Sequence, residues 1–587
     1  MKIKIIAVSL LFLILYHNGV NAYDDVNTHP LLTDTAVKKS VLKNYLFQNI
    51  GEDFLKNYDT VINGRKILDW IKKGSTDEDS PMCRAANHFH DPLKTWNDSA
   101  MSDQPWFIDA WCSDWKPLYS NVTWATGYLA PAPVGQKVSF STLSANAPIN
   151  WDRARDYYYK ALTLTTKEDR EIYFAWSFQA VGQVMHLLQD VSVPAHVRND
   201  FTSHLVFNKI NSINPGKWFI QPFEHYVKTH PELVADVQPV TPSFTNPRLT
   251  DFWDTNIYDG SSPAIRNDIG LAEYTNANFL SDFTIFKNYP HPAKVNTTAK
   301  LVEQYAKDGK LDKVWYVMGY TSERLAAYSY FWKNGLPPTT LWLYHLDDYV
   351  HADYASQLIP RAVGYSSGLL NYFFRGDMEA ISTPTGLKIK NINTETMSSY
   401  TDSTGATIGS ISIYYDNRNN ERQLLATYNL SIPLAPGQET PTITYTPPSD
   451  NIAIGKYIIV FHGKLGNEEG AVIGKVVNLK SIYYTSARGG IEKIYKMATD
   501  GSNPTVVYDN QNSNVYIRQP KPSPDGKTLG FVVYTSADDL IGSIYLILIK
   551  ASLNHTRNRY DSGTQNHFPK EASNEILHQS AQILLRY

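Results

Sequence analysis

Residues 167–190 (KEDREIYFAWSFQAVGQVMHLLQD) constrain the fold most, because apolar side chains nearly surround the helix that their spacing predicts. Such a helix has to be covered by other elements, so we expect it inside a large helical domain. Thr166, followed by Asp169, predicts its start. Helical spacing extends from Thr33 to about Gly376 and includes a second strong helix at 350–374, in which we expect Pro360 to kink or divide the helix.

The composition changes after residue 376, and at 587 residues the chain is long enough for two to four domains. Thr, Ser, Ile, Tyr and Asn become frequent, and the segments 406–417 and 456–465 alternate as strands do. We therefore predict a multidomain chain: an all-α domain at 23–376, then a β-sandwich-like domain at 377–478.

An internal repeat follows in residues 479–587. Tyr484-Thr485-Ser486-Ala487 with Ile494-Tyr495 recurs 50 residues later as Tyr534-Thr535-Ser536-Ala537 with Ile544-Tyr545. The period resembles blades of a TolB-type β-propeller, although two blades cannot close a ring. We expect a short propeller-like repeat fragment, with chance similarity between two hairpins as the alternative.

The N-terminus indicates export. Lys2 and Lys4 precede an apolar run at 5–16, and Val20-Asn21-Ala22 supplies the small residues of a cleavage site. We expect residues 1–22 to be a signal peptide, the mature chain to begin at Tyr23, and the protein to be periplasmic or extracellular without an integral membrane anchor. In an exported protein the two cysteines, Cys83 and Cys112, predict a disulfide.

The densest chemical signal is the segment 186–196 (HLLQDVSVPAH). His186 and Asp190 are four residues apart and so share one helix face, and Pro194 ends the helix and lets His196 return toward that face. Imidazole and carboxylate together suit zinc, although a single pair of this kind is more often an internal His–Asp contact. Further clusters favour the metal: His29, Glu78-Asp79 with the segment 87–92 (NHFHDP), and the segment 223–227 (FEHYV).

The order and spacing of these clusters resemble the bacterial zinc-dependent phospholipase C family and its relatives, the single-strand-specific zinc nucleases. The resemblance covers roughly the first 375 residues and implies up to three Zn²⁺ ions. One ion would be held by Asp79, His88, His186 and Asp190, and Asp190 would bridge to a second ion. That second ion would take His29 and the amine and carbonyl of Tyr23, where the family has Trp.

The third implied ion departs from the family pattern. His196 and Glu224 match, but Ile220 stands where the family has a histidine four residues before the carboxylate. His204 is the remaining ligand candidate, and a surface histidine is the alternative for it. We expect His90 and His225 to be structural or to contact ligands, and Arg198 to be either a phosphate clamp or a surface arginine.

The resemblance implies hydrolysis of phosphodiesters by metal-activated water, with Asp79 also accepting a proton. The leading expectation is a phospholipase C acting on glycerophospholipids, with peripheral contact to a membrane surface. The β-domains lie outside the resemblance, and we expect them to bind a protein or polymer partner. A nuclease or nucleotidase is the first alternative and requires exposed aromatic residues for base stacking. The first domain offers Trp96, Trp106, Trp111, Trp115 and Trp124, although we expect these to be buried core residues. A metal-stabilised surface or adhesion protein is the second alternative.

The formal charge of −3 gives the chain no overall basic field for nucleic acid or anionic lipid.

Overall fold

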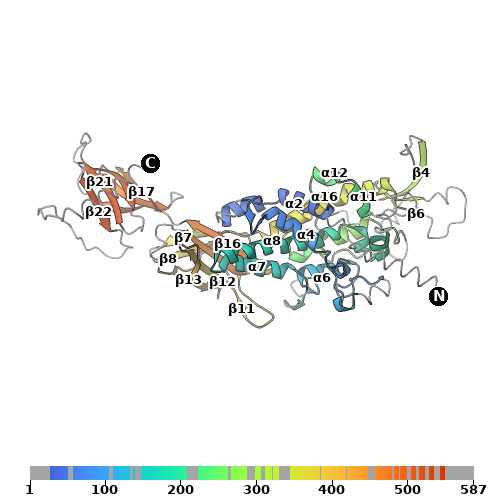
Figure 1. Ribbon diagram of the computed structural model, residues 1–587, viewed down its shortest axis with the longest axis horizontal. Coiled ribbons are helices and arrows are strands. Elements are labelled where there is room, and N and C mark those ends of the chain that lie inside the picture. Colours follow the sequence, from blue (N-terminus) through green and yellow to red (C-terminus); the bar gives the residue numbers. More distant parts are fainter. Residues whose placement is uncertain are drawn as a thin grey trace.

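The computed structural model describes residues 27–548 except 51–56, 105–109, 111, 132–136, 139, 141–146, 208–222, 262–265, 287–297, 306–310, 320, 329–343, 384, 418, 447–455, 479–480, 488–489, 499–503, 510–514, 523–527 and 535–542. The expected signal peptide and Tyr23 lie outside the described residues. A helical part, a β-sandwich and a pair of small sheets follow one another along the molecule (Figure 1).

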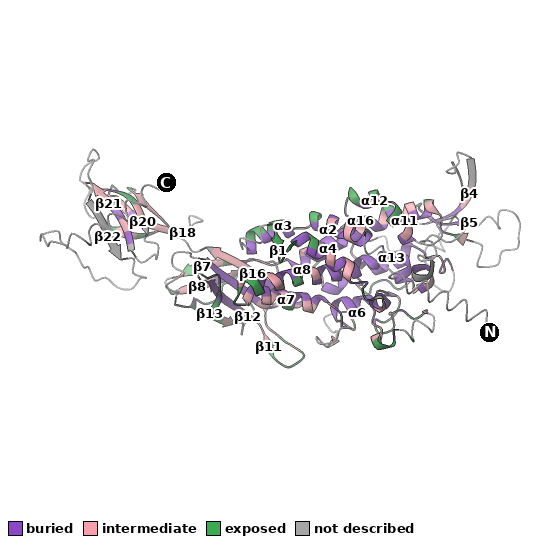
Figure 2. Cartoon of the chain, in the orientation of Figure 1, coloured by how far each residue is buried: buried purple, intermediate pink, exposed green. Residues whose placement is uncertain are grey.

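The helical part surrounds α8 (Lys167–Asp190), whose bounds match the predicted helix. The Thr166 side chain accepts a hydrogen bond from the backbone N–H of Asp169, as its position predicts. From Phe178 to Asp190 every residue of α8 except Gln179 is buried, and Figure 2 shows the buried interior along α8 and α16. The surrounding longer helices are α2 (Thr28–Lys39), α4 (Ile67–Asp77), α7 (Trp151–Thr163), α13 (Leu271–Asn278) and α16 (Asp348–Phe373).

Shorter helical turns carry much of the site. Those before α8 are α3 (Leu42–Tyr45), η1 (Leu46–Ile50), η2 (Met82–Asn87), η3 (Ser113–Trp115) and α6 (Asn121–Thr126). Those after it are α9 (Pro194–Val197), η4 (Thr202–Phe207), α11 (Phe223–Thr229), α12 (Glu232–Ala235) and η5 (Leu249–Phe252). A small hairpin of β1 (Val61–Ile62) and β2 (Arg65–Lys66) precedes α4.

A pair of glycines brings α4 and α8 unusually close. A Cβ atom on Gly74 would lie 1.9 Å from the Gln179 carbonyl oxygen, and one on Gly182 would lie 1.9 Å from the Ile71 carbonyl oxygen. Only glycine permits this backbone approach. The crossing sets the distance between the C-terminal turn of α4 and the ligand-bearing end of α8.

Two expectations for this part need correction. It is not all-α, because β3 (Thr298–Tyr305), β4 (Leu311–Met318), β5 (Arg324–Tyr328) and β6 (Tyr344–His345) form an antiparallel sheet. Pro360 does not divide α16, which is continuous from Asp348 to Phe373. The helix survives because packing holds both of its halves: Val350, Leu358, Val363 and Leu370 are all fully buried.

The β-sandwich has the strands that alternation predicts, β12 (Ser410–Asp416) and β15 (Lys456–Leu465). They pair with each other and with β13 (Arg422–Asn429) and β16 (Glu468–Asn478), and β9 (Met397–Ser398) joins at β15. The second sheet consists of β7 (Met378–Thr383), β8 (Gly386–Asn391) and β14 (Ile443–Thr444), and β10 (Tyr400–Thr401) pairs with β11 (Thr407–Ile408). Both sheets contribute to one apolar core that includes Met378, Ile389, Ile413 and Phe461.

A buried ion-pair network joins the helical part to the sandwich. Glu468, at the start of β16, accepts hydrogen bonds from Nε and Nη2 of Arg155 at 2.8 and 3.1 Å and from Nε1 of Trp151 at 2.8 Å. Arg375, just after α16, donates to the same carboxylate at 2.5 Å. The two parts therefore share a specific polar interface.

The last described strands form two three-stranded antiparallel sheets: β17 (Ser481–Ser486), β18 (Lys493–Ala498) and β19 (Thr505–Asp509), and β20 (Tyr516–Pro522), β21 (Thr528–Tyr534) and β22 (Ser543–Leu548). The sequence repeat falls on the hairpins β17–β18 and β21–β22, but β17 lies at a sheet edge and β21 in a sheet centre. The registers also differ, because Tyr484 pairs with Tyr495 whereas Tyr545 pairs with Phe531. The described residues form no closed propeller.

Cys83 and Cys112 form a disulfide, as expected. Within the described part of the chain, no helix has the length and apolar character needed to cross a membrane.

Candidate metal centre

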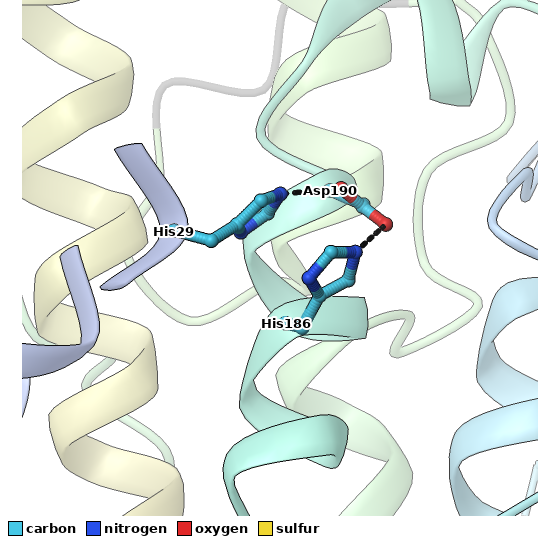
Figure 3. Close-up of side chains that lie close together, drawn as sticks. All are labelled: His29, His186 and Asp190. Atoms are coloured by element: carbon cyan, nitrogen blue, oxygen red, sulfur yellow. Dashed lines mark ion pairs between the residues drawn. The ribbon is translucent and has the colours of Figure 1, made fainter. Parts of the chain in front are cut away.

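The C-terminal end of α8 and the start of α2 bring three ligand-type side chains together (Figure 3). Asp190 Oδ1 lies 3.2 Å from His29 Nε2, and Asp190 Oδ2 lies 3.3 Å from His186 Nε2. The His29 and His186 rings stack with centroids 3.7 Å apart. The two oxygens of Asp190 thus serve two different imidazoles, as a carboxylate between two cations would.

Asp79 and His88 extend this group from the chain after α4. His88 Nδ1 lies 2.8 Å from Asp190 Oδ2 and 3.5 Å from Asp79 Oδ1, and His186 Nε2 lies 3.6 Å from Asp79 Oδ1. Each of the sets Asp79–His88–His186 and His29–His186–Asp190 has ligand atoms within 4.8 Å of one another. They form one continuous cluster.

A third group lies beside the first two. His196 on α9, His204 on η4 and Glu224 on α11 also have ligand atoms within 4.8 Å of one another. Glu224 Oε1 is 3.4 Å from His196 Nε2 and 3.0 Å from His204 Nδ1. His204 is fully buried, so it is not a surface histidine. Pro194 begins α9 instead of ending α8, which stops four residues earlier, and this turn directs His196 toward Glu224.

The chemistry of these groups fits a divalent cation. Within the described residues, both carboxylate oxygens of Asp79 and Asp190 and Nε2 of His186 and His196 are buried without a hydrogen-bond partner. Buried polar atoms of this kind are costly unless something binds them. Imidazole nitrogens with carboxylate oxygens are the donor set that zinc takes in proteins. The residues therefore fit Zn²⁺.

The carboxylates carry the charge that a cation requires, but two of the histidines hold protons that a metal would displace. Burial lowers the pKa of His186 and of His196, but the charge of Asp190, with that of Asp79 for His186 and of Glu224 for His196, outweighs it and raises both pKa values. Burial by itself raises the pKa of Asp190, but the charges of His186, His196 and His88 reverse the effect and hold that pKa well below its usual value. For Glu224, burial is likewise outweighed by His204 and His196, which lowers its pKa to about 2. Burial and the neighbouring His186 lower the pKa of His29. Ionised carboxylates and a neutral imidazole are the forms that bind a metal.

Backbone carbonyls orient two of the histidines. Nδ1 of His186 lies 2.6 Å from the Ser75 carbonyl oxygen, and Nδ1 of His196 lies 3.0 Å from the His88 carbonyl oxygen. A carbonyl only accepts, so each Nδ1 carries a proton, and each Nε2 is the ring atom that remains to bind a metal. The close crossing of α4 and α8 supplies the first of these contacts.

Glu78 forms a buried ion pair next to the ligand groups. The sequence analysis did not predict this role. The Glu78 carboxylate accepts two hydrogen bonds from Arg84 Nη2, at 2.8 and 2.6 Å, and one from Trp124 Nε1 at 2.9 Å. Glu78 Oε1 is 3.9 Å from Nε2 of His88. No sequence signal distinguishes it from an ordinary acid that precedes a ligand.

Other singled-out residues lie outside the three groups. His90 contacts Asp254 at 2.9 Å and Ser99 at 3.0 Å, and its backbone N–H donates to the His196 carbonyl, so it is a structural neighbour of the site. His225 belongs to none of the groups found among the described residues. Arg198 is fully buried and donates to the Thr284 hydroxyl and the Asn276 carbonyl, which removes the expectation that it lies at the surface.

Comparisons with known proteins leave the function to be argued from the site. No protein-family model and no curated protein matches the chain. Among solved structures, an alpha toxin from Clostridium absonum has a TM-score of 0.25 and 11% identity, covering 90% of this chain and 100% of the toxin. The alpha-toxin of an avian strain of Clostridium perfringens has a TM-score of 0.20 and 13% identity, with coverages of 89% and 98%. Both likenesses are distant.

Proposed function

We propose that the protein is a secreted zinc-dependent phosphodiesterase of phospholipase C type, which cleaves glycerophospholipids to diacylglycerol and a phosphorylated head group. One observation carries the proposal: three groups of buried imidazoles and carboxylates adjoin one another, and Asp79, Asp190, His186 and His196 contribute buried atoms that make no hydrogen bond within the described residues. A purely structural metal site needs one closed group of four ligands. Adjoining groups suit a reaction in which several cations act on one phosphate.

Zinc ions held there would supply an activated water and neutralise the negative charge that develops on a phosphodiester. The protein's own groups would divide the remaining tasks. Asp190, whose two oxygens face His29 and His186, would contribute to holding two ions. Burial raises the pKa of Asp79, but the charges of His186 and His88 outweigh this effect and lower it, so the carboxylate is ionised. An ionised Asp79 can accept a proton from the attacking water.

The first domain gives little support to the nuclease alternative. Trp96 and Trp124 are buried, and their indole N–H groups donate to Asp254 and Glu78, so neither offers a face to a nucleobase. Trp115 is half-buried, and Trp106 and Trp111 lie outside the described residues. We therefore favour a phospholipid as the substrate.

The start of the mature chain provides the sharpest test. We propose that the amine and carbonyl of Tyr23 complete the ligand set of the ion beside His29. The amine is free to bind a metal only after residues 1–22 have been removed, so the proposal makes metal binding depend on that cleavage. The mature chain from Tyr23 is compared with a version that carries one additional N-terminal residue. We expect the extended version to lose about one zinc ion and most of its activity.

Both versions are assayed on phosphatidylcholine vesicles and on single-stranded DNA, with zinc measured by atomic emission. Cleavage of the lipid alone supports the proposal, and cleavage of DNA alone supports the nuclease alternative. Bound zinc without any turnover supports a metal-stabilised surface protein. Equal zinc content in the two versions would contradict the amine ligand.

The role of a single ligand is tested by replacing two histidines in turn, His204 on η4 and His225 on α11. We expect His204→Ala to lose about one zinc ion, because it removes one of three members of the third group. His225→Ala, next to Glu224 but outside the groups, is the control and should retain the zinc of the unmodified protein.

A further inference from the structure

Gln189 connects three helices around His29. Its Oε1 atom lies 2.8 Å from His29 Nδ1, and its Nε2 atom lies 3.0 Å from the Thr33 hydroxyl and 3.4 Å from the Ser366 hydroxyl. Gln189, Thr33 and His29 are fully buried, as is Ser366. The contacts join α8, α2 and α16 next to the ligand group of His29, His186 and Asp190.

The orientation of the Gln189 amide indicates which nitrogen of the His29 ring carries the proton. In the structure the side-chain NH₂ of Gln189 donates to the Thr33 and Ser366 hydroxyls, and the amide oxygen faces His29. An oxygen accepts only if His29 carries its proton on Nδ1. The lone pair of His29 then lies on Nε2, which faces Asp190 at 3.2 Å.

We propose that Gln189 is a positioning residue for the metal centre: its amide oxygen holds the proton of His29 on Nδ1 and thereby leaves the Nε2 lone pair for the cation that His29 and Asp190 would hold. The inference rests on the proposed function. It goes beyond the ligand set, because Gln189 itself supplies no ligand atom.

The other histidines show why this residue matters. His186 and His196 are oriented by backbone carbonyls, so no single side-chain substitution removes the acceptor. His29 depends instead on a side chain, and that side chain is adjacent to Asp190 on the same helix. Loss of a hydrogen-bond partner behind a metal-binding histidine typically lowers metal affinity by about 10- to 100-fold.

The test uses two substitutions of Gln189 in the mature chain. Gln189→Met keeps the length of the side chain and removes the acceptor, whereas Gln189→Glu keeps an acceptor and removes the donor. Gln357→Met is the control, because Gln357 on α16 also accepts a hydrogen bond, from the Tyr274 hydroxyl at 2.8 Å, away from the three ligand groups. Thermal unfolding of the metal-free proteins identifies any general loss of folding.

Zinc affinity is measured by competition with a chelator, and the His29 tautomer in the zinc-loaded protein by ¹⁵N NMR. We expect Gln189→Met to weaken one zinc ion about 10- to 100-fold, and we expect Gln189→Glu and Gln357→Met to keep it within about threefold. We also expect the Nδ1–H tautomer of His29 in the unmodified protein. Equal weakening by the two Gln189 variants, unchanged affinity in Gln189→Met, or a proton on Nε2 overturns the inference.

The outcomes separate this inference from the proposed function. An unmodified protein that binds zinc with the expected tautomer but cleaves no phosphodiester contradicts the function and leaves the role of Gln189 in place. An unmodified protein that binds no zinc overturns both.

Discussion

At the scale of single residues, the buried carboxylates have two different roles: some are available to bind a cation, and one neutralises a buried arginine. Those of Asp79 and Asp190 have ligand-type histidines as neighbours and make no hydrogen bond within the described residues, whereas the Glu78 carboxylate accepts hydrogen bonds from Arg84 and Trp124. Glu78 therefore balances a buried guanidinium close to the site, while its neighbour Asp79 remains available to a cation.

Replacing Glu78 tests this division. We expect Glu78→Gln to lower the free energy of unfolding by about 3–5 kcal/mol, because it leaves the Arg84 charge buried and uncompensated. Urea unfolding of the metal-free protein measures the effect. The control is Asp156→Asn, which breaks an exposed ion pair with Lys160 and should cost less than about 1 kcal/mol. Equal effects of the two substitutions would contradict the role of Glu78.

Sequence reasoning grouped the ligand-type residues because their identities and spacings are visible in the chain. It could not find the groups that orient them. The partner of His186 is the carbonyl of Ser75, which any residue at that position would provide. His204 reaches Glu224 across an intervening segment of the chain whose path spacing does not determine.

At the scale of secondary-structure elements, the distance between α4 and α8 controls the Ser75–His186 contact. We expect Gly182→Ala to destabilise the protein by about 1–3 kcal/mol, because the added Cβ would lie 1.9 Å from the Ile71 carbonyl and push the helices apart. Zinc affinity should fall as well, since the Ser75 carbonyl moves away from His186. Both quantities are measured by unfolding and by chelator competition.

Gly368→Ala is the matched helical control. Its Cβ would lie 3.1 Å from the edge of the Phe252 ring, and the gain in helix propensity of about 1 kcal/mol offsets that contact. We expect stability within about 1 kcal/mol of the unmodified protein and unchanged zinc affinity. If Gly182→Ala behaved in the same way, the close crossing would have no role in shaping the site.

The disulfide stabilises a second element of the site. Cys83 lies in η2, whose C-cap is His88, and its partner Cys112 is 29 residues away. We expect Cys83→Ser with Cys112→Ser to lower stability by about 3–4 kcal/mol, the range for a loop of this length. Thermal unfolding under non-reducing conditions measures it. A change below 1 kcal/mol would show that packing alone holds η2.

Elements were predictable where local and long-range signals agreed. The bounds of α8 follow from the Thr166 cap and from apolar residues on nearly every side. The sheet β3–β6 was missed because its strands interrupt a helical domain, in which the sequence analysis expected helices alone. Pro360 weakens α16 locally, but burial along the whole helix outweighs the loss of one hydrogen bond.

At the scale of the whole molecule, the sequence predicts the succession of a helical part and β-rich parts but not how they join. Arg155, Arg375 and Glu468 are far apart in the chain, and nothing in their local sequence marks them as one network. The 50-residue repeat likewise identifies two hairpins without determining their strand order or register.

The network makes the junction sensitive to acid. Burial raises the pKa of Glu468, but the charges of Arg155 and Arg375 outweigh it and lower that pKa below its usual value. A lowered pKa in the folded state means that the stabilisation is fully present above the unfolded pKa of about 4.3 and is lost as pH falls through the folded value. Acidification below about pH 5 should therefore weaken the contact between the helical part and the sandwich.

We expect Glu468→Gln to be about 3–5 kcal/mol less stable than the unmodified protein at pH 7, because two buried guanidinium groups lose their counter-charge. The difference should narrow between about pH 5 and pH 3, since the unmodified protein then protonates the same carboxylate. Urea unfolding across this range measures the gap. Glu439→Gln, in an exposed pair with Lys388, should differ little from the unmodified protein at any pH. A Glu468→Gln gap that stayed constant as the pH fell would mean that this carboxylate does not make the junction acid-sensitive.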